Sequence, residues 1–172
     1  MFKKRVVVSL LMSIALLIGA AVSFATVASP GHTNSFSAID GGEIRYGGGT
    51  KYFLPFNSAL SQWNSLGKVN IAPDTIWVIE DLTFTDMYSS LVPWAGLYSY
   101  DNLYADTIQY NDYYLQVSSD SIIRNTVIHE IGHALGIMDH YYPWDYIVMH
   151  GHITGTTSLT SHDITDYHIA NP

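Results

Sequence analysis

The feature that most constrains this chain is a pair of histidines four residues apart, in the run His129-Glu130-Ile131-Gly132-His133. Four residues turn an α-helix by about 400°, so on a helix the two imidazoles share one face about one turn apart. This separation lets two ring nitrogens reach one zinc ion at about 2.0–2.1 Å. Glu130 is then placed to take the proton of a water that attacks a carbonyl. Because the motif fixes only three positions, an ordinary structural helix is the alternative interpretation.

The residues that follow the motif favour the zinc interpretation. Gly136 stands where a helix can end in a left-handed turn, which lets the chain double back toward the metal. Asp139 and His140 then follow at the point where a third ligand is needed, and zinc accepts oxygen and nitrogen ligands alike. A methionine, Met149, comes next after a proline-containing loop.

This order of residues resembles the metzincin clan of zinc endopeptidases, in which His-Glu-x-x-His is followed by glycine, a third ligand three residues later, and a methionine turn. The run Gly136-x-x-Asp139-His140-Tyr141 is similar to the snapalysins, which are small secreted bacterial metzincins. Bacterial matrixin-like peptidases usually have a histidine in the place of Asp139. The tyrosine that some metzincins carry two residues after the methionine is replaced here by Gly151.

The resemblance implies a role for each matching residue. Zinc would be held by His129, His133 and Asp139, Glu130 would be the general base, and Met149 would form a hydrophobic floor beneath the metal. Asp139 is in register without an insertion, whereas one extra residue in the loop would make His140 the third ligand. The implied fold is α+β: a metzincin-like zincin domain with a twisted mixed β-sheet, an active-site helix and a small irregular C-terminal subdomain.

Local patterns predict the main elements. Helices are expected at residues 55–66, from about residue 119 through the histidine motif, and after Thr160, where Thr160-Ser161-His162-Asp163 resembles a capping box. Strands are expected at residues 43–46, 69–71, 75–79, 107–111 and 113–115. In metzincins an edge strand just before the active-site helix pairs with extended substrate, so the resemblance implies this role for residues 107–115.

The N-terminus predicts export. Met1-Phe2-Lys3-Lys4-Arg5 is basic, and an uncharged apolar run follows it, so residues 1–25 are interpreted as a signal peptide. An uncleaved membrane anchor is the alternative, because the run approaches the ~20 residues of a membrane span. Residues 26–42 would be a flexible leader or short pro-segment, and residues 43–172 the catalytic domain. We therefore expect a secreted protein without stable membrane association after cleavage.

Composition excludes some partners. Removing residues 1–25 removes three of the seven basic residues and none of the fifteen acidic ones, which changes the net charge from −8 to −11. Such an acidic chain is not expected to bind nucleic acid.

The chain has no cysteine, so it has no disulfide framework. Calcium would suit the acids Asp81, Asp86, Asp101 and Asp106, but they lack the spacing of a calcium loop, and a solvated surface is the simpler interpretation.

The sequence thus predicts a monomeric, secreted zinc endopeptidase that acts on protein or peptide substrates. The alternative is a secreted or surface binding protein that uses zinc only for stability, which would not need Glu130. His150 and His152 flank Gly151, and one of them could hydrogen-bond the transition state, although surface histidines are the default interpretation. The aromatic loop at residues 141–146 could line a substrate pocket or pack on the rest of the domain.

Overall fold

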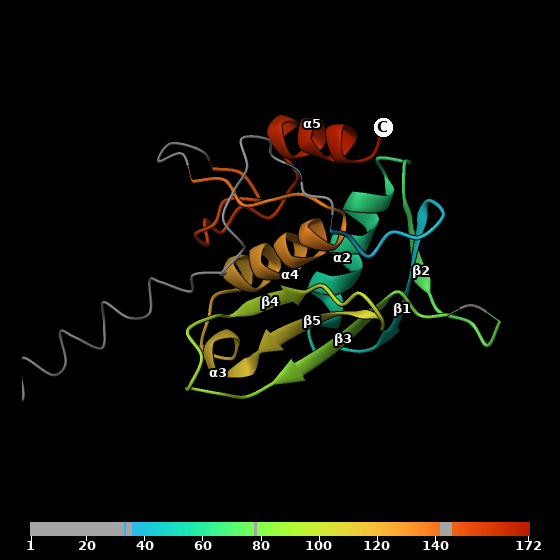
Figure 1. Ribbon diagram of the computed structural model, residues 1–172. Coiled ribbons are helices and arrows are strands. Elements are labelled where there is room, and N and C mark those ends of the chain that lie inside the picture. The colour runs from blue at the N-terminus through green and yellow to red at the C-terminus, as the bar shows by residue number, and fades with distance from the viewer. Residues whose placement is uncertain (1–32, 34–35, 78, 142–145) are drawn as a thin grey trace, which may run out of the picture.

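A five-stranded mixed sheet forms the base of the structure (Figure 1). The computed structural model describes residues 33, 36–77, 79–141 and 146–172, so the expected signal peptide, most of residues 26–35 and residues 142–145 lie outside it. The strand order is β2-β1-β3-β5-β4, in which only β4 is antiparallel to its neighbour. The strands are β1 (Glu43–Gly48), β2 (Asn70–Pro73), β3 (Leu82–Met87), β4 (Gly96–Ser99) and β5 (Asp106–Asn111).

Two long helices cover one face of this sheet. Helices α2 (Phe53–Asn64) and α4 (Asp120–Ala134) pack against each other above the strands (Figure 1). The short helix α3 (Asp112–Leu115) follows β5 directly, and α5 (Ser161–Ala170) lies beyond α4, away from the sheet. Between α4 and α5 the described residues contain no helix or named strand. The described residues between α4 and α5 are thus irregular, as expected for the C-terminal part. Helix α4 lies between the sheet and this segment.

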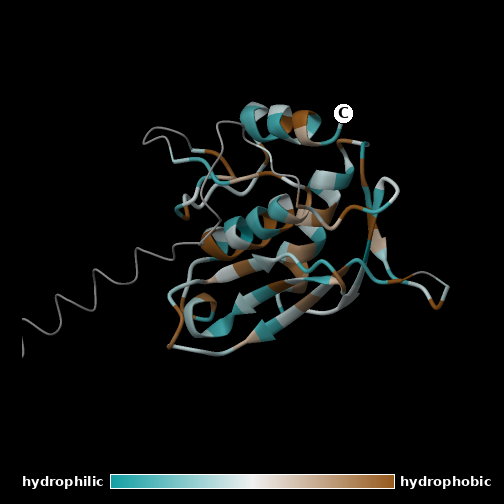
Figure 2. Cartoon of the chain, in the orientation of Figure 1, coloured by the Kyte–Doolittle hydropathy of each residue, from teal (hydrophilic) through white to brown (hydrophobic). Residues whose placement is uncertain are grey.

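The core lies between the sheet and the helices, where apolar residues of strands and helices meet (Figure 2). Phe84 of β3 packs edge-on against Phe56 of α2, with ring centroids 4.7 Å apart. Trp63 of α2 is fully buried and donates a hydrogen bond from its indole nitrogen to the carbonyl of Ile128 in α4, at 3.0 Å. The core therefore holds α4 in a fixed position against α2. A fixed helix keeps the functional side chains on it in a constant arrangement.

Two expected strands are wrong. The described residues of the first, 75–77 and 79, do not pair: β2 ends at Pro73, and the connection to β3 projects from the sheet with apolar colour near its tip (Figures 1 and 2). Ile76 and Trp77 are 89% and 87% exposed there, so the β-forming residue types have no neighbouring strand to pair with. The expected strand at residues 113–115 is helix α3, because the side chain of Asn111 accepts a hydrogen bond from the backbone of Tyr113 and caps a helical turn.

The expected edge strand is also wrong. Residues 107–111 form β5, which lies inside the sheet between β3 and β4. The exposed edge beside α4 is β4, because the hairpin from β4 to β5 adds one antiparallel strand outside β5. Sequence order places β5 last before α4, but the order of strands in space places β4 at the edge.

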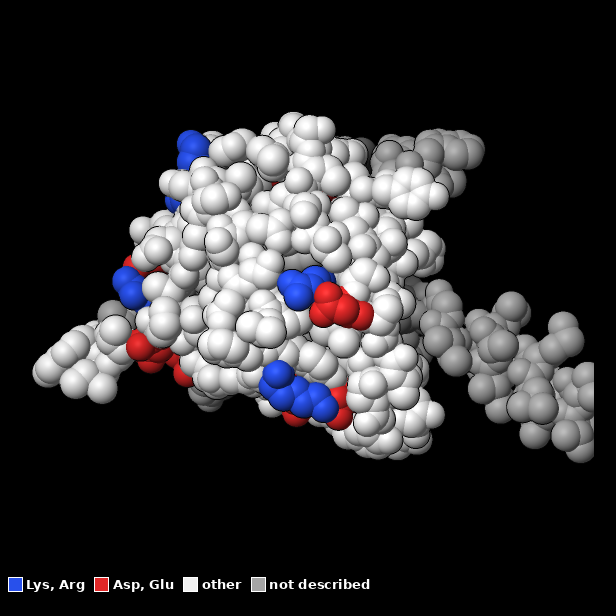
Figure 3. Space-filling model, turned by 180° about the vertical axis from the view of Figure 1, so that it is seen from behind, with Lys and Arg blue, Asp and Glu red and all other residues white. Residues whose placement is uncertain are grey.

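Charged side chains are sparse on the surface, and three of the basic ones form ion pairs. Arg45 lies 2.6 Å from Glu43, Arg124 lies 2.6 Å from Asp120, and Lys51 contacts Asp112. The face shown in Figure 3 is mostly uncharged, and its few basic side chains are scattered over it rather than clustered. Within the described part of the chain, no helix combines the length and apolarity needed to cross a bilayer.

Candidate metal centre

The expected zinc helix is α4, and its ends form as the sequence predicts. Ser119 caps it by accepting a hydrogen bond from the backbone of Ile122. At the other end Gly136 has a φ of +83°, Gly136 N donates to His133 O at 2.9 Å, and Ile137 N donates to Gly132 O at 3.1 Å. This paired pattern is a Schellman turn, which needs glycine in the left-handed position. The chain therefore reverses direction right after the second histidine and returns along the helix.

The reversal brings Asp139 back to the two histidines. His129 Nε2 and His133 Nε2 lie 3.0 Å apart, and Asp139 Oδ1 lies 3.1 Å from the first and 3.4 Å from the second. The three side chains are buried. Ligands on a tetrahedral zinc ion with bonds of 2.0–2.1 Å are about 3.3 Å apart. The three atoms thus have the spacing of three ligands around one metal.

The ring orientations direct the three polar atoms of the triangle toward one point, where a cation fits. His129 Nδ1 lies 2.9 Å from the carbonyl oxygen of Val148, and His133 Nδ1 lies 2.8 Å from that of Ile137. Each Nδ1 therefore donates its hydrogen to a carbonyl, which leaves the lone pair of a neutral ring on Nε2. Two such lone pairs and a carboxylate oxygen then face one another, and Asp139 Oδ1 makes no well-directed hydrogen bond to any residue that the structure describes. The set fits a divalent metal such as zinc.

The charges in the cluster support one another. Burial by itself would lower the pKa of His129, but the adjacent Asp139 outweighs it and raises the pKa to about 9. Burial would raise the pKa of Asp139, but the two imidazoles hold it well below its ordinary value. Asp139 is therefore ionised throughout the neutral range, as a metal ligand must be.

His140, the alternative third ligand, points away from the triangle. Its Nε2 lies 2.8 Å from Asp166 Oδ2 of α5. Its backbone pairs with the other side of the loop: His140 N donates to Met149 O, and Gly151 N donates to His140 O, both at 2.8 Å. The structure brings Asp139 to the two histidines and His140 to α5.

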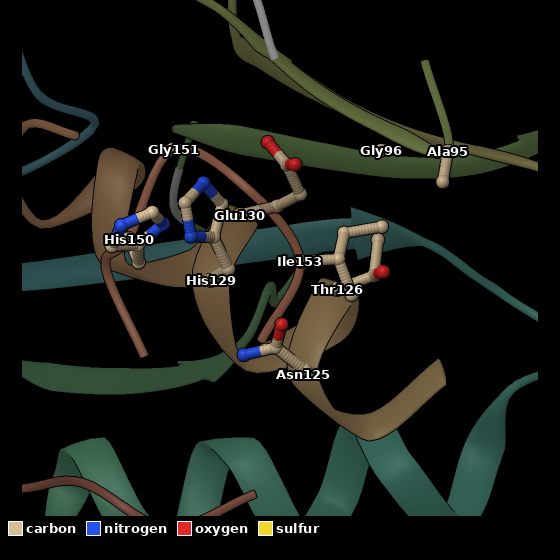
Figure 4. A pocket seen from close by; sticks show the side chains of 9 residues that line it. All are labelled: Ala95, Gly96, Asn125, Thr126, His129, Glu130, His150, Gly151 and Ile153. Atoms are coloured by element: carbon tan, nitrogen blue, oxygen red, sulfur yellow. The ribbon is translucent and has the colours of Figure 1, made fainter. Parts of the chain in front are cut away.

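Glu130 lies beside the triangle in a small open pocket (Figure 4). Its carboxylate is directed toward β4, where a Cβ added to Gly96 would lie 2.6 Å from Glu130 Oε1. Burial raises the pKa of Glu130, while the neighbouring imidazoles work in the opposite direction. Glu130 Oε2 is buried and has no hydrogen-bond partner among the described residues. A carboxylate with an unused acceptor and a raised pKa is suited to take up a proton.

Met149 lies against α4, between the two histidine-bearing turns. It is fully buried, and a Cβ added to Gly132 would lie 2.2 Å from Met149 Sδ. Gly132 therefore leaves the space that the methionine occupies. Asp163 of α5 accepts hydrogen bonds from Val148 N and Met149 N, at 3.2 and 3.0 Å, and so fixes the loop that carries both the methionine and the carbonyl acceptor of His129.

Tyr141 contacts the triangle directly, whereas the sequence suggests only a place in an aromatic loop. Its hydroxyl donates to Asp139 Oδ2 at 3.1 Å, on the carboxylate oxygen opposite the triangle. A Cβ added to Gly151 would lie 2.3 Å from the Tyr141 ring, so the glycine makes room for it. Two sequence features point to this contact. The position two residues after Met149, which some metzincins fill with tyrosine, is Gly151 here, and Tyr141 stands two residues after Asp139.

The two histidines after Met149 differ in position. His150 lines the pocket beside His129 (Figure 4), whereas His152 is exposed. His152 N donates to His150 Nδ1 at 3.0 Å, which orients the His150 ring. Calcium is the less favoured interpretation of four acids in the sequence. Among the described residues, Asp81, Asp86, Asp101 and Asp106 belong to no metal-sized group of ligands.

The fold has counterparts among solved structures. Two structures of myroilysin are 17% and 16% identical to this chain, with TM-scores of 0.50 and 0.51; each alignment covers 92% of this chain and 96% or 95% of the other. The chain therefore shares its overall fold with these structures. A chain of the ECX AB5 holotoxin in its GM1-bound form is 13% identical, with a TM-score of 0.54 over 84% of this chain and 86% of that one. No protein-family model and no curated protein matches the sequence.

Proposed function

We propose that this chain is a secreted zinc-dependent endopeptidase of the metzincin type. The observation that carries the proposal is the buried triangle of His129 Nε2, His133 Nε2 and Asp139 Oδ1, with sides of 3.0, 3.1 and 3.4 Å, and the carboxylate of Glu130 next to it. The metalloprotease-like fold supports the same reading. Secretion rests on the basic and apolar residues 1–25.

The chain supplies binding, orientation and proton transfer. A zinc ion in the triangle would polarise the substrate carbonyl and lower the pKa of a bound water to about 7. Glu130 takes the proton of the attacking water and returns it to the leaving amine. Met149 and the carbonyls of Val148 and Ile137 keep the imidazoles in place during this cycle. His150, on the pocket wall, is positioned to donate a hydrogen bond to the oxyanion.

Substrate binding is assigned to β4 rather than to residues 107–111. β4 is the edge strand beside α4, and its first residue, Gly96, lies against Glu130. An extended peptide can add to such an edge through main-chain hydrogen bonds, which demand little of the peptide sequence. The partner is therefore a protein or peptide in extended form, bound by a monomeric enzyme.

Casein hydrolysis by the purified protein tests the proposal. We expect cleavage that is lost on dialysis against a zinc chelator and restored by added Zn²⁺. A protein that binds zinc but cleaves neither casein nor a peptide library would be the zinc-stabilised binding protein instead. Activity that survives complete removal of metal would contradict the proposal.

Gly96→Ala should lower activity without removing zinc. The new Cβ would lie 2.6 Å from Glu130 Oε1 and 2.8 Å from Thr126 Cγ2, so the carboxylate must move. Because misplacement by about 1 Å can cost about 100-fold in rate, kcat/KM should fall by roughly this factor. Gly49→Ala is the matched control, since its Cβ meets nothing within 4 Å. Equal rates for the two variants would show that the carboxylate position is not critical.

Tyr141→Phe should weaken zinc binding while leaving the fold intact. The change removes the hydrogen bond of 3.1 Å to Asp139 Oδ2, which holds the carboxylate in its orientation. Loss of such a partner typically costs 10–100-fold in metal affinity or activity, and we expect about 10-fold here. Competition with a chromophoric chelator measures the affinity, and Tyr113→Phe on α3 is the control. An unchanged affinity would mean that the ring packing alone positions Asp139.

Zinc binding should become tighter as the pH rises toward 9. Without metal, Asp139 raises the pKa of His129 from 6.5 to about 9, so His129 is protonated at neutral pH and zinc must displace that proton. The His129–Asp139 pair stabilises the metal-free fold fully below pH 6.5, and this contribution is lost as the pH rises through about 9. Between these values the apparent affinity should rise by up to about tenfold per pH unit. Calorimetry in two buffers of different ionisation enthalpy should detect about one released proton; no release would contradict the shifted pKa.

A further inference from the structure

A second group of metal-ligating side chains lies between the loop after α4 and the first turns of α5. It consists of His140, His162 and Asp166, each of which offers one ligand atom within 4.8 Å of the others. His162 and Asp166 are four residues apart on α5, so both side chains project from one face of that helix. His140 reaches them from the residue that follows Asp139. The group shares no side chain with the triangle of His129, His133 and Asp139.

The three side chains converge on one point. Asp166 Oδ2 lies 2.8 Å from His140 Nε2 and 3.7 Å from His162 Nε2, values that bracket the ~3.3 Å between ligands on a tetrahedral zinc ion. The rings of His140 and His162 meet edge to face, with centroids 4.4 Å apart. A simple ion pair between His140 and Asp166 would not require a second imidazole to approach the same carboxylate oxygen. Two nitrogens and one oxygen around a common point are the ligand set of zinc and related divalent metals.

Burial and access also suit a metal. The side chains of His140 and Asp166 are 0% and 1% exposed, whereas that of His162 is 34% exposed. Two ligands are thus held rigidly in the interior, and the third lies at the surface, where an ion can enter and a water can take the fourth position. One carboxylate and two neutral imidazoles would leave a bound Zn²⁺ with a net charge of +1, which is less costly to hold near the surface than in the core.

We propose that His140, His162 and Asp166 form a second, structural site for a divalent transition metal, with Zn²⁺ as its ligand. The metal would join α5 to the loop that carries Asp139. The backbone of His140 already pairs with Met149 and Gly151, and Asp163 of α5 already holds Val148 and Met149. A metal at this site would therefore hold together the two segments of the loop that carry His140 and Met149. Because it binds only the folded chain, it would also stabilise the fold by mass action.

Counting bound zinc tests this site. The full chain is dialysed against Zn²⁺ alone, and the metal that remains is measured by elemental analysis. We expect two equivalents in the wild type, one in His162→Asn and two in His168→Asn, a control on an exposed residue of the same helix. His162→Asn should retain casein hydrolysis, because it leaves the triangle intact. An unchanged zinc content in His162→Asn would overturn the proposal.

A second measurement separates this site from the proposed active centre. His129→Asn/His133→Asn removes two ligands of the triangle, and this variant should still bind one equivalent of Zn²⁺ and show a melting temperature that rises with Zn²⁺ concentration. Adding His162→Asn should abolish both effects, and adding His168→Asn should not. With Co²⁺ in place of Zn²⁺, the d–d absorption of the double variant should likewise vanish with His162→Asn. If the double variant folds but takes up no metal, the second site does not exist, whatever the protein's activity.

Discussion

Replacing Glu130 with glutamine is expected to lower kcat by about 100- to 10,000-fold, the usual contribution of a general base, while zinc content stays the same. Glutamine has nearly the same shape but cannot accept a proton from water. Glu130 is not one of the three atoms of the triangle, and its Oε2 makes no hydrogen bond among the described residues, so the fold should tolerate the change. Steady-state kinetics on a casein-derived peptide and elemental analysis of the same sample provide the two readouts.

Glu43→Gln is the matched control for this prediction, because it removes a carboxylate from β1 whose partner is Arg45 on the same strand. It should leave kcat unchanged. If Glu130→Gln keeps its activity, the proton must go elsewhere, and the assignment of Glu130 fails. If it loses zinc along with activity, its effect is structural and says nothing about proton transfer.

Asp139→Ala should weaken zinc binding at the active centre by at least about 100-fold, more than His140→Ala does. Asp139 supplies one of the three ligand atoms, and loss of even an outer partner of a ligand costs 10–100-fold. His140 contacts Asp166 instead, so its loss reaches the triangle only through the loop. The comparison is made in a His162→Asn background, so that metal near His140 does not enter the measured affinity.

Circular dichroism of the metal-free variants controls for unfolding, because both residues are buried. The expected order of zinc affinity is parent, then His140→Ala, then Asp139→Ala. The reverse order for the two variants would move the third ligand to His140 and would mean that the loop between α4 and Met149 is arranged differently.

The sequence predicts the parts of the site that depend on local rules. The histidine spacing, the glycine turn at Gly136 and the cap at Thr160 each depend on a few neighbouring residues, and all three form as expected. Asp139 also lies beside the histidines in the register that an uninterrupted loop implies. Each of these features depends on residues within about one or two helical turns of one another, so it can be predicted from the sequence.

Features that depend on distant segments were not predictable in this way. The residue types in 75–79 favour a strand, but a strand also needs a partner, and β1 pairs with β2 only as far as Pro73. The resemblance implies the edge role for residues 107–115, because chain order does not show that β4 folds back outside β5. The meeting of Tyr141 with Gly151, and of His140 with Asp166 at a separation of 26 residues, likewise exists only in the folded loop.

The central claim is that one zinc ion is bound by two turns of α4 and the loop that returns after Gly136. Anomalous diffraction at the zinc absorption edge, on crystals of the zinc-loaded protein, tests it most directly. The account predicts a peak equidistant, at about 2.0–2.2 Å, from His129 Nε2, His133 Nε2 and an oxygen of Asp139, with the Glu130 carboxylate beside it. Zinc-loaded crystals without anomalous density at this triangle would contradict the account.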